Sequence, residues 1–377
     1  MKLVIISHTE HYKLPNGTIV GWGPTINELN HLSEKFQEIT HIAMLKEETA
    51  PPSALPYNAS NIKFIPLPPL GGNTFSSKLK TIFTAPKIIL IVKKELQSAD
   101  VFQLRTPTGI GVFLIPYLTL FSKKKGWYKY AGNWNQKNPP LGYRLQRWML
   151  KKQKRSVTIN GKWENQPKQC ITFENPCLTV EEYNLGKTII SEKKYQAPFS
   201  FCFVGRLEKP KGVERIIEAF SNLTPEEKKN IAQIDFVGDG TETEYFKKLA
   251  SKSGVLMNFH GFLPRNKVFE LYKKSHLFLL PSTASEGFPK VIAEAMNFGC
   301  IPIVSNVSSI GQYINDENGY IVSPTTSGKL NSILSEISKV EEVILKQKAA
   351  KGRNVSQYFT FENYNHRILK EIISKTK

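Results

Sequence analysis

The stretch FSFCFVGRLEKPKGVERIIEAF, residues 199–220, joins a strand-like run to a helix-like run through a turn rich in glycine and cations. Its first part, 199–207, holds three phenylalanines and a valine, which favour a strand. From residue 212 the apolar side chains recur at helical spacing. A strand, a short turn and a helix in this order are typical of a βαβ unit. They predict a parallel sheet whose ligands bind beyond the carboxyl ends of its strands.

The same alternation extends through the chain in both directions. We predict strands over 2–7, 40–45, 62–66, 101–104, 156–159, 170–173, 199–207, 232–240, 255–262, 276–282 and 300–305. We predict helices over 24–37, 76–95, 110–122, 141–152, 212–223, 243–254, 266–275 and from Pro289 onward. The polar stretch 186–199 is interpreted as a linker. The fold class is therefore α/β, with two doubly wound domains, 1–188 and 198–359, and a ligand site in the cleft between them.

Composition and length favour a soluble protein with sizeable cores. The chain has 377 residues, of which 40% are hydrophobic and 22% charged, which is ordinary for globular domains. Its longest apolar run, Ile110–Phe121, is interrupted by Pro116 and is shorter than the roughly 20 residues that span a bilayer. The N-terminal MKLVIISHTEH is too short to be a signal peptide and is predicted to be the first strand. A cytoplasmic protein is expected.

The charge is strongly positive and unevenly distributed. The formal net charge is +19, and residues 101–163 contain 13 Lys or Arg but no Asp or Glu, interleaved with aromatic side chains. Three interpretations stay open: a solvated basic face, a nucleic-acid surface, or an anionic membrane surface. Without a nucleic-acid recognition motif, we do not expect a nucleic-acid partner. Aromatic residues mixed with cations favour the membrane surface.

The four cysteines carry no sign of metal binding. Cys170, Cys177, Cys202 and Cys300 are scattered. Cys170 and Cys177 have neither metal-ligand spacing nor a histidine partner nearby, and Cys202 and Cys300 lie in strand-like runs. We predict buried thiols.

Glycine-rich turns follow each predicted strand of the second half. In VGRLEKPKG (204–212), Arg206 and Lys211 are five residues apart at a strand end, and two such cations suit a diphosphate. The alternative is simple surface solvation. The turns VGDG (237–240) and FHGFLP (259–264) permit close backbone approach, and such loops can hold a nucleobase through backbone groups.

The stretch SEGFPKVIAEAM, residues 285–296, opens the next helix. We predict Pro289 at the first helical position, with the helix amides and dipole forming an anion site. Glu294, about one turn inside, would accept hydrogen bonds from a ribose, and Glu286 would face a sugar on the distal phosphate. The alternatives are a dipole-stabilised Glu286 and a Glu294 paired with Lys290.

Together these motifs resemble the C-terminal half of a family-4, retaining GT-B glycosyltransferase (glycosyl transferases group 1). The resemblance covers about residues 199–323. It rests on FVGRLEKPKGVERIIEAF, FVGDG, FHGFLP, LFLLPSTASEGFPKVIAEAMNFGCIPIVS and INDENGYIV. Glu286 and Glu294 match the E-x7-E signature of that family. The fold implied is GT-B, in which two Rossmann-like domains face each other across a cleft.

The resemblance implies a role for each matched residue. Arg206 and Lys211 stabilise the leaving nucleoside diphosphate, Glu286 contacts the donor sugar and Glu294 binds the ribose. Arg206, Lys211 and Glu286 are thus the expected catalytic residues. The expected donor site comprises Gly21, Gly23, Gly205, Arg206, Lys211, Gly261, Phe262, Glu286, Gly287, Phe288, Pro289, Lys290 and Glu294. Since cations and helix amides stabilise the departing charge and no Asp-x-Asp motif is present, no metal or other cofactor is expected.

The N-terminal half matches the family less closely. Gly21 and Gly23 lie where the family has a glycine-rich loop that approaches the diphosphate, although an ordinary turn is the alternative. Where the family often has a histidine, this chain has Arg105. Arg105, His8 and His11 are the candidates for the acceptor side. The end of the chain, about 360–377, resembles the helix that crosses back to the first domain in this fold.

These observations predict a retaining glycosyltransferase (a hexosyltransferase-type enzyme, EC 2.4). It would move a sugar from a nucleotide-sugar donor to a glycan or lipid-linked acceptor in surface polysaccharide biosynthesis: capsule, O-antigen or exopolysaccharide. The protein would be cytoplasmic and peripheral at the inner face of the membrane, which it would contact through residues 101–163. The alternatives are a GT-B nucleotide-sugar epimerase and a non-catalytic protein that binds sugar nucleotides or membranes.

Overall fold

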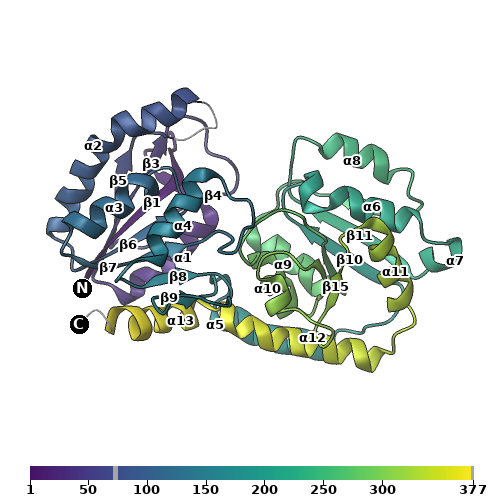
Figure 1. Ribbon diagram of the computed structural model, residues 1–377. Helices are drawn as coiled ribbons and strands as arrows, with labels where there is room; N and C mark the ends of the chain where they lie inside the picture. Colours follow the sequence, from purple (N-terminus) through teal and green to yellow (C-terminus); the bar gives the residue numbers. More distant parts are fainter. Residues whose placement is uncertain (71–74, 375–377) are drawn as a thin grey trace. The chain divides into compact units, whose positions relative to one another are not determined.

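The computed structural model describes residues 1–70 and 75–374. The chain divides into two compact units, one made of Met1–Asn175 with Phe361–Lys377 and the other of Pro176–Thr360 (Figure 1). Each unit is built around its own largely parallel sheet, so the predicted α/β class with two doubly wound domains is confirmed. The predicted cleft between the domains stays a prediction.

The first unit contains a nine-stranded sheet with the order β4-β2-β1-β6-β7-β8-β9, in which β3 also pairs with β1, and β5 with β3. All strand pairs that involve neither β2 nor β4 are parallel. The strands are β1 (Lys2–Lys13), β2 (Ile19–Trp22), β3 (Glu38–Lys46), β4 (Ala54–Pro56), β5 (Ile62–Leu67), β6 (Val101–Thr106), β7 (Lys125–Tyr130), β8 (Val157–Ile159) and β9 (Cys170–Thr172). The short antiparallel strands β2 and β4 extend the sheet beside the second half of β1.

Helices cover both faces of this sheet. They are α1 (Gly23–Leu32), followed by a 3-10 turn (Ser33–Lys35), α2 (Phe75–Gln97), α3 (Gly111–Phe121), α4 (Leu141–Lys151) and α13 (Phe361–Arg367), which continues as a π-helical turn (Ile368–Ile373). Ile88, Leu114 and Leu150 of α2, α3 and α4 share one apolar cluster, whereas Leu29 of α1 and Tyr364 of α13 belong to another. α2–α4 therefore form one layer, and α1 with α13 the opposite one.

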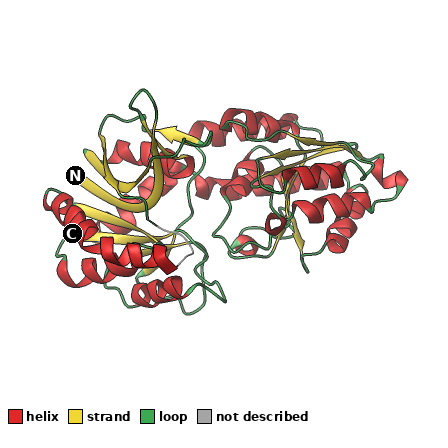
Figure 2. Ribbon diagram, turned by 90° about the horizontal axis from the view of Figure 1, so that it is seen from above, coloured by secondary structure: helices red, strands yellow, loops and turns green. Residues whose placement is uncertain are grey.

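The second unit has a six-stranded parallel sheet with the order β12-β11-β10-β13-β14-β15, and Figure 2 shows helices on both of its sides. The strands are β10 (Phe199–Val204), β11 (Ile231–Val237), β12 (Met257–Phe259), β13 (Leu277–Leu280), β14 (Ile301–Ser305) and β15 (Tyr320–Val322). The helices are α5 (Val180–Glu192), α6 (Val213–Ser221), α7 (Pro225–Lys228), α8 (Thr243–Ala250), α9 (Arg265–Lys274), α10 (Lys290–Asn297), α11 (Ser327–Ile337) and α12 (Glu342–Ser356), with 3-10 turns at Lys209–Lys211, Ile310–Gln312 and Gln357–Phe359.

The predicted linker over 186–199 is wrong for its first half, because residues 180–192 form α5. Thr179 caps this helix through a capping box with Glu182, and Ile190 packs into the core of the second unit. The division between the units consequently falls after Asn175, earlier than the predicted end of the first domain at 188.

The first and last segments of the second unit lie side by side. Leu178 forms a parallel bridge with Thr360. The backbone amides of Cys177 and Leu178 both donate to the carbonyl oxygen of Phe359, at 2.8 and 3.2 Å. The chain therefore enters and leaves this unit at one place, and residues 361–374 return to the first unit. The last three residues of the predicted crossing helix, 375–377, lie outside the described residues.

Two simpler expectations have clear outcomes. All four cysteines are buried free thiols, as predicted. No helix among the described residues is both long enough and apolar enough to cross a bilayer.

Candidate active site

The loops after β10, β11, β12 and β13 meet at one edge of the second sheet. The Leu207 amide donates to the Asp239 carbonyl (3.0 Å), and the Gly238 amide donates to the Gly261 carbonyl (2.8 Å). A third bond joins the Thr283 amide to the Pro210 carbonyl (2.8 Å). Since the carboxyl ends of parallel strands share an edge, the four motifs that are distant in the sequence form one site.

Two glycines permit this close approach. Gly238 has a φ of 125°, and a Cβ there would lie 1.9 Å from the Gly205 carbonyl oxygen. Gly212 has a φ of 96°, and a Cβ there would lie 2.4 Å from the Pro281 carbonyl oxygen. A side chain at either position would collide with backbone, in a conformation that L-residues rarely adopt. At these two positions the close approach is therefore between loops of the protein.

Lys211 and Glu286 form an ion pair at the centre of this edge. The Lys211 side chain is only 11% exposed, whereas that of Glu286 is 39% exposed. A buried ammonium needs a compensating anion, and Glu286 provides it. The family resemblance implied separate roles for Lys211 and Glu286, and their direct pairing was not predicted.

Arg206 lies at the same edge but on the surface. Its side chain is 69% exposed, and its guanidinium contacts the Glu208 carboxylate at 3.0 Å. Exposed pairs of this kind contribute about 0–1 kcal/mol. An anion could therefore displace Glu208 from Arg206 at little cost.

Helix α10 begins directly beside this pair. Pro289 is the residue before the helix, one position earlier than predicted, and no side chain caps the helix. The apolar side chains of Ile292 and Met296 anchor α10 in the core. The N-terminal end of the helix dipole is therefore held at the loop 285–289, where it favours an anion.

Glu294 is partly buried in the second turn of α10. The alternative in which Lys290 is its partner stays open, because the charge of Lys290 acts on this carboxylate. Burial raises the pKa of Glu294 above its ordinary value, while the charges of Arg265 and Lys290 act in the opposite direction. A carboxylate in this setting retains its capacity to accept hydrogen bonds from a ligand.

Arg265 was not anticipated from the sequence. It donates to both oxygens of the Glu182 carboxylate and to the Cys177 carbonyl oxygen. It thereby joins α9 to α5 beside Glu294. In the sequence, Arg265 looks like any exposed arginine at the start of a helix. The only local signal was the T-x-x-E capping pattern of Thr179 and Glu182, which indicates that its partner Glu182 begins a helix.

A pocket of about 380 Å³ opens beside the ends of β11 and β12. It is lined by Asp239, Gly240, Thr241, Thr243, Glu244, Lys247, Phe259 and Gly261. Gly261, a predicted donor-binding residue, thus lines a pocket, while Phe262 next to it is exposed. Backbone groups and an aromatic ring border this pocket.

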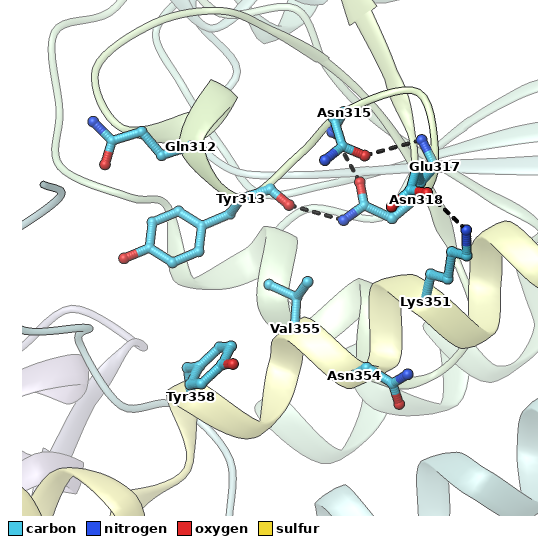
Figure 3. Close-up of a pocket in the computed structure, with 9 residues that line it drawn as sticks. All are labelled: Gln312, Tyr313, Asn315, Glu317, Asn318, Lys351, Asn354, Val355 and Tyr358. Carbon is cyan, nitrogen blue, oxygen red and sulfur yellow. Dashed lines mark hydrogen bonds and ion pairs between the residues drawn. The ribbon is translucent and has the colours of Figure 1, made fainter.

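Figure 3 shows a second pocket, of about 450 Å³, which the sequence analysis did not anticipate. It is lined by Gln312, Tyr313, Asn315, Glu317, Asn318, Lys351, Asn354, Val355 and Tyr358. The Tyr313 ring also packs against Phe288 and Phe359, with centroids 5.0 and 5.5 Å apart. This aromatic group supports the loop that carries Glu286.

In the first unit, Arg105 lies in a buried ion-pair cluster, and its expected place at the acceptor side stays a prediction. Arg105 is buried, and its guanidinium contacts the Glu28 carboxylate at 2.7 Å. The Lys129 ammonium contacts the same carboxylate oxygen at 2.6 Å and donates to the Tyr364 hydroxyl at 3.1 Å. These residues come from β6, α1, β7 and α13, so the cluster ties the terminal helix to the sheet.

His11 is likewise buried and does not line a surface site. Its Nδ1 lies 3.1 Å from the Thr9 carbonyl oxygen, which can only accept. Its Nε2 therefore accepts from the Tyr57 hydroxyl (2.8 Å), which in turn accepts from Nδ1 of His41 (2.7 Å). Nε2 of His41 then accepts from the Ser7 hydroxyl at 2.8 Å. His11 is a neutral member of this hydrogen-bonded chain.

The remaining predicted residues of the first unit have packing roles. A Cβ at Gly21 would lie 2.5 Å from the His11 ring, and a Cβ at Gly23 would lie 2.7 Å from the Ser53 carbonyl oxygen. Both glycines are explained by packing within the unit. His8 is partly buried near Gly109, and its Nε2 has no partner among the described residues.

Known proteins resemble part of this chain in sequence and nearly all of it in fold. Residues 187–353 match the family described as "Glycosyl transferases group 1". A capsular polysaccharide biosynthesis glycosyltransferase, CapH of Staphylococcus aureus, is 34% identical over 141 residues, which are 36% of this chain and 38% of that protein. A lipopolysaccharide 1,6-galactosyltransferase of Salmonella typhimurium is 28% identical over 54% of this chain and 57% of its own length. The chain matches about two-fifths of the length of the first curated relatives.

Among solved structures, HepE of Anabaena in complex with UDP aligns with a TM-score of 0.71 and 15% identity, over 99% of this chain and 100% of that one. The protein thus has the GT-B fold of glycosyltransferases, as predicted. The likeness to group 1 glycosyltransferases is carried by residues 187–353, which are less than half of the chain.

Proposed function

We propose that this protein is a glycosyltransferase that uses a nucleotide-diphosphate sugar as donor. The observation that carries the proposal is the convergence of Lys211, Arg206, the uncapped start of α10 and Glu294 at one sheet edge. All four lie within the residues that match the group 1 family. The names of the similar proteins, and the UDP bound to HepE, support the same conclusion.

In this proposal each group of the site has one task. The amides of Gly287 to Lys290 that carry N–H, together with Lys211 and Arg206, hold the diphosphate and stabilise its charge as it departs. Glu294 accepts hydrogen bonds from the ribose, and the pocket bordered by Gly261 receives the nucleobase. Glu286 contacts the donor sugar and, through its ion pair, keeps Lys211 in place between turnovers.

We further propose that transfer retains the anomeric configuration. The leaving diphosphate would deprotonate the acceptor hydroxyl as that hydroxyl attacks on the same face, so no side chain acts as nucleophile. No group of three or more His, Cys, Asp or Glu residues in the described part of the chain is placed to hold a metal. We expect turnover to continue in excess EDTA, and loss of activity that Mg²⁺ or Mn²⁺ restores would overturn this part of the proposal.

For the acceptor, we propose a glycan or a lipid-linked glycan of a surface polysaccharide (capsule, O-antigen or exopolysaccharide). The first unit would bind it, at the cytoplasmic face of the membrane. The similarity to the capsular and lipopolysaccharide enzymes supports this assignment.

The deciding experiment measures nucleoside diphosphate released from UDP-, GDP- and ADP-sugars, with and without lipid-linked glycan acceptors. We expect release that depends on the acceptor and a product whose anomeric configuration, measured by NMR, equals that of the donor. Release without an acceptor, with an epimerised sugar, would indicate an epimerase instead. Nucleotide binding without any turnover would indicate a non-catalytic protein.

Variants of the two cations test the site directly. Lys211→Met removes a group that stabilises developing charge, so we expect kcat to fall by about 10²–10³, and Arg206→Met to act in the same direction. Lys209→Met, on the same 3-10 turn but paired with Glu214 at the surface, is the matched control. Equal activity of the Lys211 and Lys209 variants would contradict the proposed role.

A further inference from the structure

The outer surface of the α2–α4 layer is unusually apolar for a surface. Leu120 and Phe121 are 73% and 76% exposed, and Leu141 and Trp148 are 73% and 55% exposed. The large exposed apolar side chains of this layer are Phe83, Leu90, Val112, Leu120, Phe121, Leu141, Tyr143, Leu145 and Trp148. Within the described residues, the opposite layer of α1 and α13 has no such side chain. A concentration of this kind marks an interaction surface.

On α4 the apolar side chains form a stripe. Leu141, Leu145 and Trp148 recur at helical spacing and are all exposed, whereas Gln146 and Leu150 point into the unit. The Gln146 side chain bonds both the amide and the carbonyl of Thr108. This anchoring fixes which face of α4 looks outward, so the stripe is a permanent feature of the surface.

The ends of α3 and α4 are joined into one surface. The Gln153 amide donates to the Thr119 hydroxyl at 2.8 Å, and the Arg155 guanidinium donates to the carbonyls of Leu118, Ser122 and Lys124 at 2.7–3.0 Å. These bonds hold the segment after α4 against the end of α3. Phe121 and Trp148 therefore belong to neighbouring elements of the same layer.

The cations of residues 101–163 fall into two groups. Five form hydrogen bonds or ion pairs inside the unit: Arg105, Lys124, Lys129, Arg147 and Arg155. The other eight have exposed side chains, although Lys162 among them also has a partner: Lys123, Lys125, Lys137, Arg144, Lys151, Lys152, Lys154 and Lys162. The Lys152 ammonium lies 4.4 Å from the Trp148 ring centroid. The exposed group includes Lys123 and Lys125 directly after α3 and Arg144, Lys151 and Lys152 on or just after α4.

We propose that the outer face of α3 and α4 docks on an anionic lipid bilayer. Apolar and aromatic side chains would enter the headgroup region, while the surrounding lysines and arginines contact lipid phosphates. The complete lack of Asp and Glu over 101–163 is the charge complementarity that selects an anionic lipid surface over a neutral one. The purpose of docking, access to a lipid-linked acceptor, rests on the proposed function, but the binding itself does not.

Sedimentation of the full chain with vesicles tests the docking. We expect binding to phosphatidylglycerol–phosphatidylcholine vesicles at low salt, weak binding to phosphatidylcholine alone, and release at high salt, because screening weakens the attraction. Lys151→Gln with Lys152→Gln should weaken binding by roughly fivefold for each removed cation. Leu145→Ser with Trp148→Ser should weaken it at least about tenfold.

Matched controls separate docking from other effects. Val343→Ser and Lys346→Gln change an exposed apolar residue and a lysine of the second unit, and both variants should bind vesicles as the parent does. Melting temperatures and the release of nucleoside diphosphate with a soluble acceptor should be unchanged in all variants. Failure of transfer with intact vesicle binding would overturn the proposed function alone.

Three results would overturn the docking surface. They are equal binding to neutral and anionic vesicles, equal loss of binding in the control variants, and a stable dimer in solution that the Leu145→Ser, Trp148→Ser variant dissolves. The last result would show that the apolar stripe of α4 is the interface between two copies of this chain.

Discussion

At the scale of single residues, ionised Glu294 lowers the stability of the unliganded protein but is the form that we expect to bind a ligand. Its folded pKa is raised by burial, so protonation favours the folded state and ionisation at neutral pH opposes it. The stability that Glu294 contributes is complete at pH values below its pKa in the unfolded chain. It is lost as the pH rises through its higher pKa in the folded protein. The ionised group therefore destabilises the unliganded protein and is useful only once a ligand donates to it.

Glu294→Gln tests this opposition. The amide removes the buried charge, so the unliganded variant should melt at a higher temperature than the parent at pH 7.5, with a smaller difference at pH 5. Transfer should fall at least about tenfold, because a charged acceptor of hydrogen bonds is lost. Glu270→Gln, a surface change on α9, is the control. A variant that is both destabilised and fully active would contradict the assignment.

Tyr57 lies between two buried histidines, His11 and His41, and its hydroxyl bonds to both. Burial lowers the pKa of His11 to about 4 and that of His41 well below its ordinary value, with His11 and Arg105 adding to the effect at His41. Both histidines stay neutral in the fold but take up protons on unfolding below about pH 6.5. Their stabilising contribution is complete above that pH and is lost as pH falls toward 4.

We therefore expect the first unit to lose stability between about pH 6.5 and 4. Tyr57→Phe leaves the Nδ1 proton of His41 and Nε2 of His11 without their partner, at a cost of about 1–3 kcal/mol for each buried group. Tyr143→Phe, at an exposed tyrosine, should cost nothing measurable. Urea unfolding across this pH range measures both effects, and flat stability from pH 7 to 4.5 would contradict the first.

At the scale of elements, Lys193 connects the ends of two helices. Its buried ammonium donates to the carbonyls of Tyr272 (3.0 Å), Ser275 (2.6 Å) and Phe298 (2.7 Å), at the carboxyl ends of α9 and α10. Cations are favourable at helix carboxyl termini. Because α10 begins at the candidate active site, this lysine fixes the far end of the helix that holds the site.

Lys193→Met should therefore destabilise the protein by about 2–5 kcal/mol, because three buried carbonyls lose a charged donor. Lys194→Met, the next residue and exposed, is the matched control and should change stability by less than about 0.5 kcal/mol. Denaturant unfolding monitored by circular dichroism makes the comparison. Similar denaturation midpoints for the two variants would show that the three hydrogen bonds of Lys193 do not stabilise the protein.

The sequence was informative where an element's own residues determine its structure. Runs such as 199–204 and 301–305 predict buried parallel strands, and helical spacing predicts α6 and α10. It failed where the pattern is weak: β7 begins with a lysine and a glycine, β2 and β4 are short, and α5 is too polar on its exposed face to stand out from a linker. Tertiary packing decides these elements.

The candidate site divides in the same way. The convergence of the second unit's motifs could be predicted because each lies at a strand end, and parallel topology brings strand ends together. Their role in binding a donor stays a prediction. Arg105 and His11 could not be placed, because their partners, Glu28 and Tyr57, are distant in the sequence and nothing local marks them. Burial of a polar residue depends on such partners.

At the scale of the whole molecule, the second unit is an insertion whose ends meet. Leu178 and Thr360 are bridged, so a fragment of residues 176–360 has adjacent termini and keeps its own core. We expect this fragment to fold by itself and to bind a nucleoside diphosphate without catalysing transfer. Circular dichroism and titration calorimetry would measure both, and a molten fragment would show that the units depend on each other for stability.

Ligand binding at this site also has a thermodynamic consequence. A ligand that binds only the folded state stabilises it, and the melting temperature then rises with ligand concentration. A ligand at 100 times its Kd contributes about 2.7 kcal/mol. Among UDP, GDP and ADP, we expect the nucleotide that raises the melting temperature of the second unit most to carry the base of the donor.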